Sequence, residues 1–214
     1  MTLLVLGAGY AGSAVARRAR GRVVVTVRSD ERAQKLRAEG FEVLAAPKLD
    51  ASIAQHVTPD TQVIVAYQPD PDTDRVVAPA LRAARAITYI ASTGVYGEVH
   101  GVIDDSTPLP AHLSERSRRL LAAEDAFRAV GATVLRCPGI YGSDRGLHMR
   151  ILRGEHRIPG AGELMSSRIH VEDLATFALH ADRAPGETFV VGDLEPARMI
   201  DLVRFVCARH NLPL

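Results

Sequence analysis

The sequence predicts an α/β protein with a doubly wound parallel sheet, and three features indicate this fold. Short apolar runs alternate with helical segments along most of the chain, which is the pattern of βαβ units. The runs are continuously apolar, as expected of strands that helices cover on both faces. A glycine turn, Gly7-Ala8-Gly9-Tyr10-Ala11-Gly12, separates the first strand from the first helix. We therefore expect roughly six or seven strands in a sheet of the Rossmann type.

Length and composition limit the classes of protein to consider. The chain has 214 residues, enough for one sizeable core, and a formal net charge of +1. This balance gives no reason to expect a nucleic-acid or membrane surface. Cys137 and Cys207 have no metal-ligand spacing, so we expect buried thiols and no metal site. A first strand without a signal peptide, and no long apolar run, predict a cytoplasmic protein.

Residues 3–28 have the pattern of a dinucleotide-binding unit: strand, glycine turn, helix, strand. Gly7 would permit the tight turn, Gly9 would let the backbone approach a pyrophosphate, and Gly12 would let helix and strand pack closely. The helix, expected over Ser13–Arg20, offers unpaired N–H groups to phosphates at its N-terminus. A glycine turn without a ligand is the alternative. The predicted cofactor contacts in this turn are Gly7, Gly9, Tyr10, Ala11 and Gly12.

The end of the second strand indicates which dinucleotide is bound. Proteins that use NAD place an acidic residue there, about 20 residues beyond the turn, to bind the ribose 2′-hydroxyl. Here that position holds Arg28, followed by Ser29 and by Arg32, and the nearest acid, Asp30, is expected to cap the next helix. A guanidinium binds a 2′-phosphate, whereas a carboxylate repels it. The pattern favours NADP over NAD; the alternative is that Arg28 is a solvated strand-end charge.

Later strands also end in loops at the edge where such sheets bind ligands. Asp50 follows a short third strand and Tyr67 follows the apolar strand of residues 62–66, so both are predicted cofactor contacts. The fifth strand leads into residues 92–97 and the sixth into residues 138–142. Further helices are expected over residues 30–38, 72–85, 114–129, 144–153, 172–181 and 196–209, the last one opened by Pro196.

Five segments in order, GAGYAG, STGVYG, RCPGIYG, RIHVEDLA and VGDLEP, resemble the extended or atypical short-chain dehydrogenases/reductases of the NAD-dependent epimerase/dehydratase group. The resemblance spans nearly the whole chain. It implies an NAD(P)-binding core over residues 1–142 and a substrate-binding region over residues 143–214, interleaved in one compact domain. It also implies a small carbonyl or hydroxyl substrate and, as one option, a homodimer.

The resemblance implies that Ser92 is the catalytic serine that hydrogen-bonds the substrate, with Thr93 beside it in the substrate site. The alternative is that Ser92 is a polar strand end that caps backbone groups. Family members carry Tyr-x-x-x-Lys on the following helix, where the lysine lowers the pKa of the tyrosine. Here the two positions fall at Arg116 and Leu120, and no lysine follows Lys48. The sequence therefore departs from the family pattern, so any hydride or epimerase chemistry needs non-standard catalytic residues.

Further side chains are candidates for the substrate end of the site. Tyr141, with Arg145 four residues later, is a candidate catalytic acid, or else an aromatic that packs the loop. Arg116, and with it Arg118 and Arg119, could bind an anionic substrate or the cofactor phosphates; a solvated helix face is the alternative for at least two of these arginines. His170 is a candidate substrate contact or a structural histidine. Two functions stay open: an NADP-dependent oxidoreductase or epimerase, and an NADP-binding sensor or regulatory protein without turnover.

Overall fold

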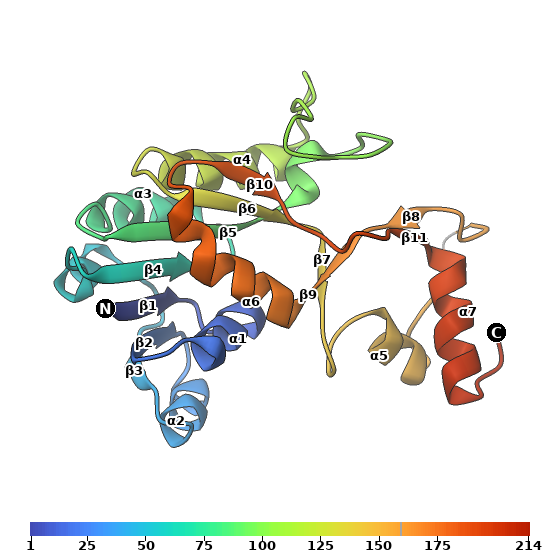
Figure 1. Ribbon diagram of the computed structural model, residues 1–214, viewed down its shortest axis with the longest axis horizontal. Coiled ribbons are helices and arrows are strands. Elements are labelled where there is room, and N and C mark those ends of the chain that lie inside the picture. Colours follow the sequence, from blue (N-terminus) through green and yellow to red (C-terminus); the bar gives the residue numbers. More distant parts are fainter. Residues whose placement is uncertain (159) are drawn as a thin grey trace.

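The computed structural model describes residues 1–158 and 160–214. Pro159 lies outside the described residues. The central element is a sheet of seven strands (Figure 1). In chain order these are β1 (Thr2–Leu6), β2 (Arg22–Val27), β3 (Glu42–Ala45), β4 (Thr61–Val65), β5 (Ala86–Ser92), β6 (Thr133–Cys137) and β10 (Thr188–Val190).

The strand order across the sheet is β10-β6-β5-β4-β1-β2-β3, and every neighbouring pair is parallel. The chain starts in the middle with β1, winds outward to β3 on one side, and returns to β4 to wind toward β10 on the other. This is the doubly wound arrangement, with its switch point between β1 and β4. The predicted α/β fold is confirmed.

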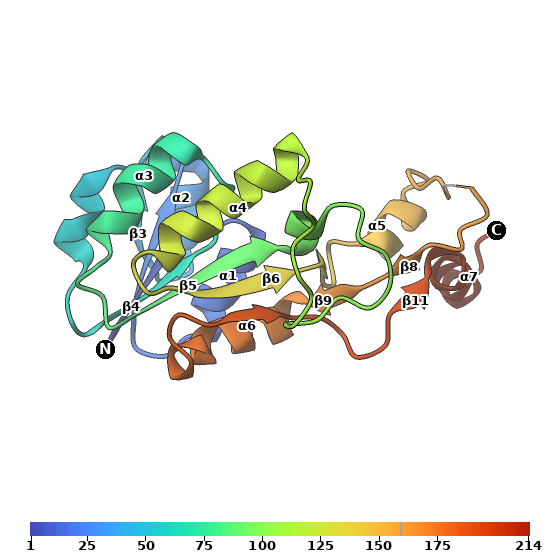
Figure 2. The ribbon, with the colours of Figure 1, turned by 90° about the horizontal axis from the view of Figure 1, so that it is seen from above.

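Helices cover both faces of the sheet, which is why β4 and β6 are buried along their whole length. Apolar side chains of α1, α2 and α6 join the core on one face, and those of η1, α3 and α4 join the core on the other. Figure 2 shows α3 and α4 on one side of the sheet and α6 on the opposite side. The helices are α1 (Tyr10–Arg18), α2 (Asp30–Ala38), η1 (Ala51–His56), α3 (Pro71–Ala80), η2 (Thr93–Tyr96), α4 (Glu115–Arg128), α6 (Val171–His180) and η3 (Ala181–Arg183).

The remaining elements lie beyond the carboxyl ends of the main strands, at one end of the molecule (Figures 1 and 2). They form two small sheets, β7 with β9 and β11 with β8, and two helices that pack together, α5 and α7. Residues 143–214 do not fold apart, because α6 and β10 return to the main sheet. The bounds are β7 (Gly139–Tyr141), α5 (Leu147–Leu152), β8 (Met165–Ser166), β9 (Arg168–His170), β11 (Ala197–Arg198) and α7 (Met199–His210).

Two helices start differently from the prediction. α1 begins at Tyr10 rather than Ser13, because the carbonyl of Gly9 already accepts the N–H of Ser13 at 3.1 Å and closes the first helical turn. α2 begins as predicted, but its cap is Ser29 rather than Asp30, since the Ser29 hydroxyl accepts a backbone N–H of the first turn. The first difference lies at the glycine turn, and the second lies at the end of β2.

Two later helices are shorter than predicted. α3 ends at Ala80 instead of Arg85, because the N–H groups of Leu81 and Arg82 reach back only three residues, to the carbonyls of Ala78 and Pro79, so the chain continues as turns. α7 begins at Met199 instead of Pro196, because the residues in between form β11 and pair with β8. Pro79 thus lies inside α3, whereas Pro196 lies outside α7.

The described ranges, 1–158 and 160–214, contain no helix long and apolar enough to cross a lipid bilayer. In the same residues no group of three or more histidine, cysteine, aspartate or glutamate side chains is arranged to hold a metal ion. Cys137 and Cys207 are free and buried, as the sequence predicted.

Candidate functional site

A cleft of about 1260 Å³ lies along the carboxyl ends of the main strands. Its walls come from the glycine turn after β1, the ends of β2 to β6, and one face of α4. It crosses the switch point between β1 and β4, where open α/β sheets bind their ligands. Arginines line both ends of the cleft. Arg28 and Arg32 lie at the end near β2, and Arg116 and Arg119 lie on α4.

The three glycines of the turn differ in what surrounds them. Gly7 has φ +92°, and a Cβ there would lie 2.7 Å from the Cβ of Tyr67, so only glycine fits the turn. A Cβ at Gly12 would collide with the carbonyl of Gly7, so this glycine allows α1 to pack closely against the turn. A Cβ at Gly9 would meet nothing within 4 Å. The backbone at Gly9 is therefore open to a ligand in the cleft.

The N-terminus of α1 points its unpaired groups at this opening. Gly9 is the N-cap and has no side chain to accept an N–H, and no acidic residue lies in the first turn. Tyr10 and Ala11, in that turn, line the cleft. Free N–H groups and the positive end of the helix dipole together favour an anion. This arrangement suits a pyrophosphate.

Thr26 holds the turn in place, although the sequence prediction did not include it. Its hydroxyl accepts the N–H of Gly7 at 2.8 Å, and its carbonyl accepts the N–H of Ala8 at 2.8 Å. The side chain is buried. The sequence feature that could have identified Thr26 is its hydroxyl group within the apolar run of β2.

The end of β2 gathers positive charge in the cleft. Arg28 is exposed, and so is Lys48, which follows β3 and was missed from the sequence. Among the described residues neither side chain makes a hydrogen bond or an ion pair. Arg32 differs, because its guanidinium donates to the carbonyl of Ala8 at 3.4 Å and to the hydroxyl of Ser13 at 2.9 Å. Arg28 and Lys48 are thus the cations available to a ligand at this end.

Asp50 and Tyr67 are both predicted cofactor contacts, but of the two only Tyr67 lines the cleft. The carboxylate of Asp50 accepts the N–H of Ser52 at 2.8 Å as the N-cap of η1, and Asp50 lies outside the cleft lining. Hydrogen bonding to Ser52 lowers the pKa of Asp50. Tyr67 lines the cleft and donates its hydroxyl to Asp74 at 2.8 Å. Burial raises the pKa of Asp74 to about 6.

Ser92 lies at the end of β5 and lines the cleft. Its hydroxyl accepts the N–H of Gly94 at 3.1 Å, so it also caps η2. The hydroxyl proton is left for a second partner in the cleft. Thr93 points elsewhere: its hydroxyl donates to the carbonyl of Cys137 at 3.4 Å, and Thr93 is not part of the lining.

α4 supplies the wall beside Ser92 with Glu115, Arg116, Arg119 and Leu120. The helix contains neither tyrosine nor lysine. A Cβ at Gly94 would lie 2.9 Å from Cδ1 of Leu120 and 3.2 Å from Oγ of Ser92, so these two side chains approach the same glycine from two sides. The structure therefore brings Ser92 and Arg116 to one part of the cleft.

Tyr141 and His170 lie together, and neither lines the cleft that Ser92 lines. They pair across β7 and β9, with their ring centroids 5.2 Å apart. Ile140, the neighbour of Tyr141, lines the cleft instead, since side chains alternate along a strand. Nδ1 of His170 accepts the N–H of Glu172 at 3.3 Å and caps α6. His170 lines a second cavity of about 610 Å³ beside α1.

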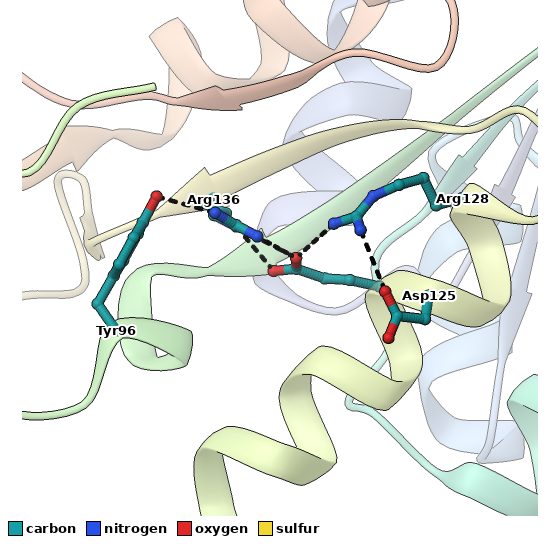
Figure 3. Close-up of polar contacts among 5 residues, drawn as sticks. Tyr96, Asp125, Arg128 and Arg136 are labelled. Atoms are coloured by element: carbon teal, nitrogen blue, oxygen red, sulfur yellow. Dashed lines mark hydrogen bonds and ion pairs between the residues drawn. The ribbon is translucent and has the colours of Figure 1, made fainter. Parts of the chain in front are cut away.

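A buried ion pair joins α4 to β6 and reaches Tyr96 (Figure 3). Arg136, on β6, donates to Glu124 of α4 at 2.8 Å and to the hydroxyl of Tyr96 at 2.8 Å. Its guanidinium carbon also lies 5.1 Å from the centroid of the Tyr96 ring. Because Tyr96 belongs to η2, this network ties together α4, β6 and the turn that Ser92 opens. The sequence prediction had missed the network.

The sequence matches no protein-family model and no curated protein. Solved structures do resemble it over its whole length. A functionally unknown conserved protein from Silicibacter pomeroyi DSS is 30% identical with a TM-score of 0.81, covering 100% of this chain and 79% of the other. A provisionally assigned NAD-dependent epimerase/dehydratase from Methylobacillus flagellatus is 28% identical with a TM-score of 0.81, covering 100% and 83%.

A third structure is more distant in sequence. The dTDP-glucose 4,6-dehydratase from Bacillus anthracis str. Ames, solved in complex with NAD, is 18% identical with a TM-score of 0.76 and covers 100% of this chain and 82% of the other. At that identity the likeness concerns the fold alone. The doubly wound sheet described above is thus shared with proteins of the epimerase/dehydratase type.

Proposed function

Because this chain belongs to the same family as the Silicibacter pomeroyi protein and shares its fold with epimerases and dehydratases, we propose that it binds a nicotinamide dinucleotide and acts as an oxidoreductase or epimerase-like enzyme. The substrate would be a small carbonyl or hydroxyl compound. The observation that carries the proposal is the uncapped N-terminus of α1 beside the open Gly9, at the switch point of the sheet.

The cleft residues fit such a cofactor. The first-turn N–H groups of α1 would hold the pyrophosphate, and Gly9 leaves the space for it. Ser92 would orient a substrate oxygen with its hydroxyl proton. The nicotinamide ring, when bound, would supply a hydride donor or acceptor. Leu120 and Ile140 give this end of the cleft apolar walls that exclude water.

We also propose that NADP is preferred over NAD. The Methylobacillus protein is assigned as NAD-dependent, so this preference rests on charges in the present chain. Arg28 and Lys48 lie at the cleft end where a ribose 2′-phosphate would be placed, and no acidic residue takes the position that would bind a 2′-hydroxyl. A guanidinium and an ammonium both favour a phosphate dianion.

The test is a titration of the purified protein with NADPH and with NADH, followed by nicotinamide fluorescence. Arg28→Asp should weaken NADPH binding by about 10- to 100-fold, the value of a charge-assisted contact, and should change NADH binding little. Arg20→Asp is the matched control, because Arg20 is exposed and lies outside the cleft lining, and it should leave both affinities unchanged.

Two outcomes would count against these proposals. Equal weakening of NADPH and NADH binding by Arg28→Asp would show that Arg28 does not read the 2′-phosphate. Failure of the wild-type protein to bind either dinucleotide would refute the proposed function itself.

A second function, a dinucleotide-binding sensor without turnover, is favoured by one specific observation. α4 has Arg116 and Leu120 where the resembled family carries its tyrosine and lysine. Single-turnover assays with carbonyl compounds separate the two functions, because a sensor would leave bound NADPH unoxidised. The homodimer and the cytoplasmic location stay predictions.

A further inference from the structure

We propose that the ligand bound beside Ser92 carries an oxyanion, a carboxylate or a phosphate, which Arg116 and Arg119 hold. The inference rests on the proposed function, because it assigns a substrate class to the same cleft. Of the three arginines that the sequence offered on this helix, it retains Arg116 and Arg119, which line the cleft, and leaves out Arg118.

The two arginines share one face of α4. They are three residues apart and so lie on the same side of the helix, and both line the cleft. Arg118, between them, is exposed and is absent from the lining. Leu120 continues the cleft face and lies against Gly94, close to Ser92. An anion on this face is therefore held next to the serine that would orient the substrate.

The two side chains are available for a ligand. Several other arginines in the structure are paired with acids, such as Arg17 with Glu39 at 2.8 Å and Arg22 with Glu42 at 2.9 Å. In residues 1–158 and 160–214, Arg116 and Arg119 make no such pair and no hydrogen bond. Glu115 is the one acid on the α4 side of the cleft lining, so this wall keeps an excess of positive charge.

The chemistry of the guanidinium determines the ligand class. Its planar set of N–H donors matches the two oxygens of a carboxylate or phosphate and forms strong, charge-assisted hydrogen bonds. It does not release a proton near neutral pH, so the arginines would bind and orient the substrate without acting as its acid. The pyrophosphate of a dinucleotide has a separate place, the N-terminus of α1, on a different wall of the cleft.

The experiment is a calorimetric titration of the protein with oxalate and, in a second arm, with inorganic phosphate, at constant ionic strength. Each arm is run without cofactor and again with saturating NADPH. Oxalate binding alone would indicate a carboxylate substrate, phosphate binding alone a phosphate ester, and either supports the proposal. Arg116→Gln and Arg119→Gln should each weaken binding by about tenfold.

Two matched variants sharpen the test. Arg118→Gln removes the same charge from the same helix outside the cleft, so it should leave anion affinity unchanged. Glu115→Gln removes the opposing carboxylate and should strengthen anion binding severalfold. Arg118→Gln should also leave NADPH affinity unchanged, because Arg118 lies outside the cleft lining. Circular dichroism of each variant verifies that α4 is intact.

The proposal is overturned if neither anion binds the wild-type protein, or if Arg118→Gln weakens binding as much as Arg116→Gln. It is also overturned if the Arg116 and Arg119 variants lose NADPH affinity as Arg28→Asp does, because the arginines would then serve the cofactor. If NADPH fails to bind while oxalate or phosphate still binds through Arg116 and Arg119, the proposed function fails and the anion site stands.

Discussion

At the scale of the residue, burial changes the chemistry of side chains that the sequence shows only as polar. Asp74 is buried on α3 beneath the cleft, where it accepts the hydroxyl of Tyr67 at 2.8 Å and the N–H of Asp70 at 3.1 Å. Burial raises the pKa of Asp74 from its ordinary value of 3.8 to about 6. Its proton is therefore bound more tightly in the folded chain than in the unfolded one.

The free energy of unfolding should consequently depend on pH through Asp74. Because the folded pKa is the higher one, this group's contribution is complete below about pH 4 and is lost as the pH rises through about 6. The stability of the wild type relative to Asp74→Asn should thus fall by about 2 to 3 kcal/mol between pH 4 and pH 7. Urea unfolding of both proteins across this range measures the difference, and a constant difference would contradict the assignment.

At the scale of the element, the buried pair of Glu124 and Arg136 joins α4 to β6. Glu124 is fully buried, and burial raises its pKa despite the neighbouring guanidinium of Arg136. Arg128 adds a second contact to Glu124 at 3.1 Å and reaches Asp125, which is exposed, at 3.1 Å (Figure 3). The carboxylate of Glu124 therefore links α4 to β6 through Arg136. Arg136 in turn contacts Tyr96, in the turn that Ser92 opens.

Removing one charge of a buried pair leaves the other without a partner. Glu124→Gln should therefore lower the free energy of unfolding by about 3 to 5 kcal/mol. Asp125→Asn is the matched control, because it removes an exposed partner of Arg128 and should cost about 1 kcal/mol or less. Urea denaturation compares the two variants. Equal, small losses would show that the buried pair is not needed for stability.

At the scale of the whole molecule, the later segments complete the core that the first half begins. Leu174, Ala175 and Ala178 of α6 are buried in the same cluster as Val15 of α1. β10 adds the last strand of the sheet beside β6, with Phe189 opposite Leu135. Within residues 1–158 and 160–214, neither of the two buried apolar clusters includes a side chain of α5 or α7, which lie at the far end of the molecule (Figure 1).

Two fragments test this division. Residues 1–142 lack α6 and β10, so one face of the sheet would lose the part of its cover that α6 supplies, and we expect this fragment to be unfolded or aggregated. Residues 1–191 keep the seven strands and α6 and should retain a cooperative unfolding transition. Circular dichroism during heating distinguishes the two. A folded 1–142 fragment would show that the first half forms a core alone.

Local patterns were sufficient for the sheet and for its glycine turn. Apolar runs predicted the strands, since a strand covered on both faces needs apolar side chains on both. Gly7 and Gly12 could be assigned roles because only glycine tolerates such a turn and such close packing. The end of β2 could be located in the same way, because Arg28 stands at a defined distance from the turn, but the preference for NADP that we infer from Arg28 stays a prediction.

What the tertiary structure decided is which side chains share the cleft. Arg119 and Lys48 line it, whereas Tyr141 lies against His170 outside it. Sequence spacing could not tell which of these side chains face the cleft. That depends on how α4 is rotated about its axis and on which side chains of β7 point toward the distant strands. The sequence by itself therefore determined the fold and its glycine turn, which arise from contacts within one βαβ unit. Packing between units determined the opposite end of the cleft, where the substrate would bind.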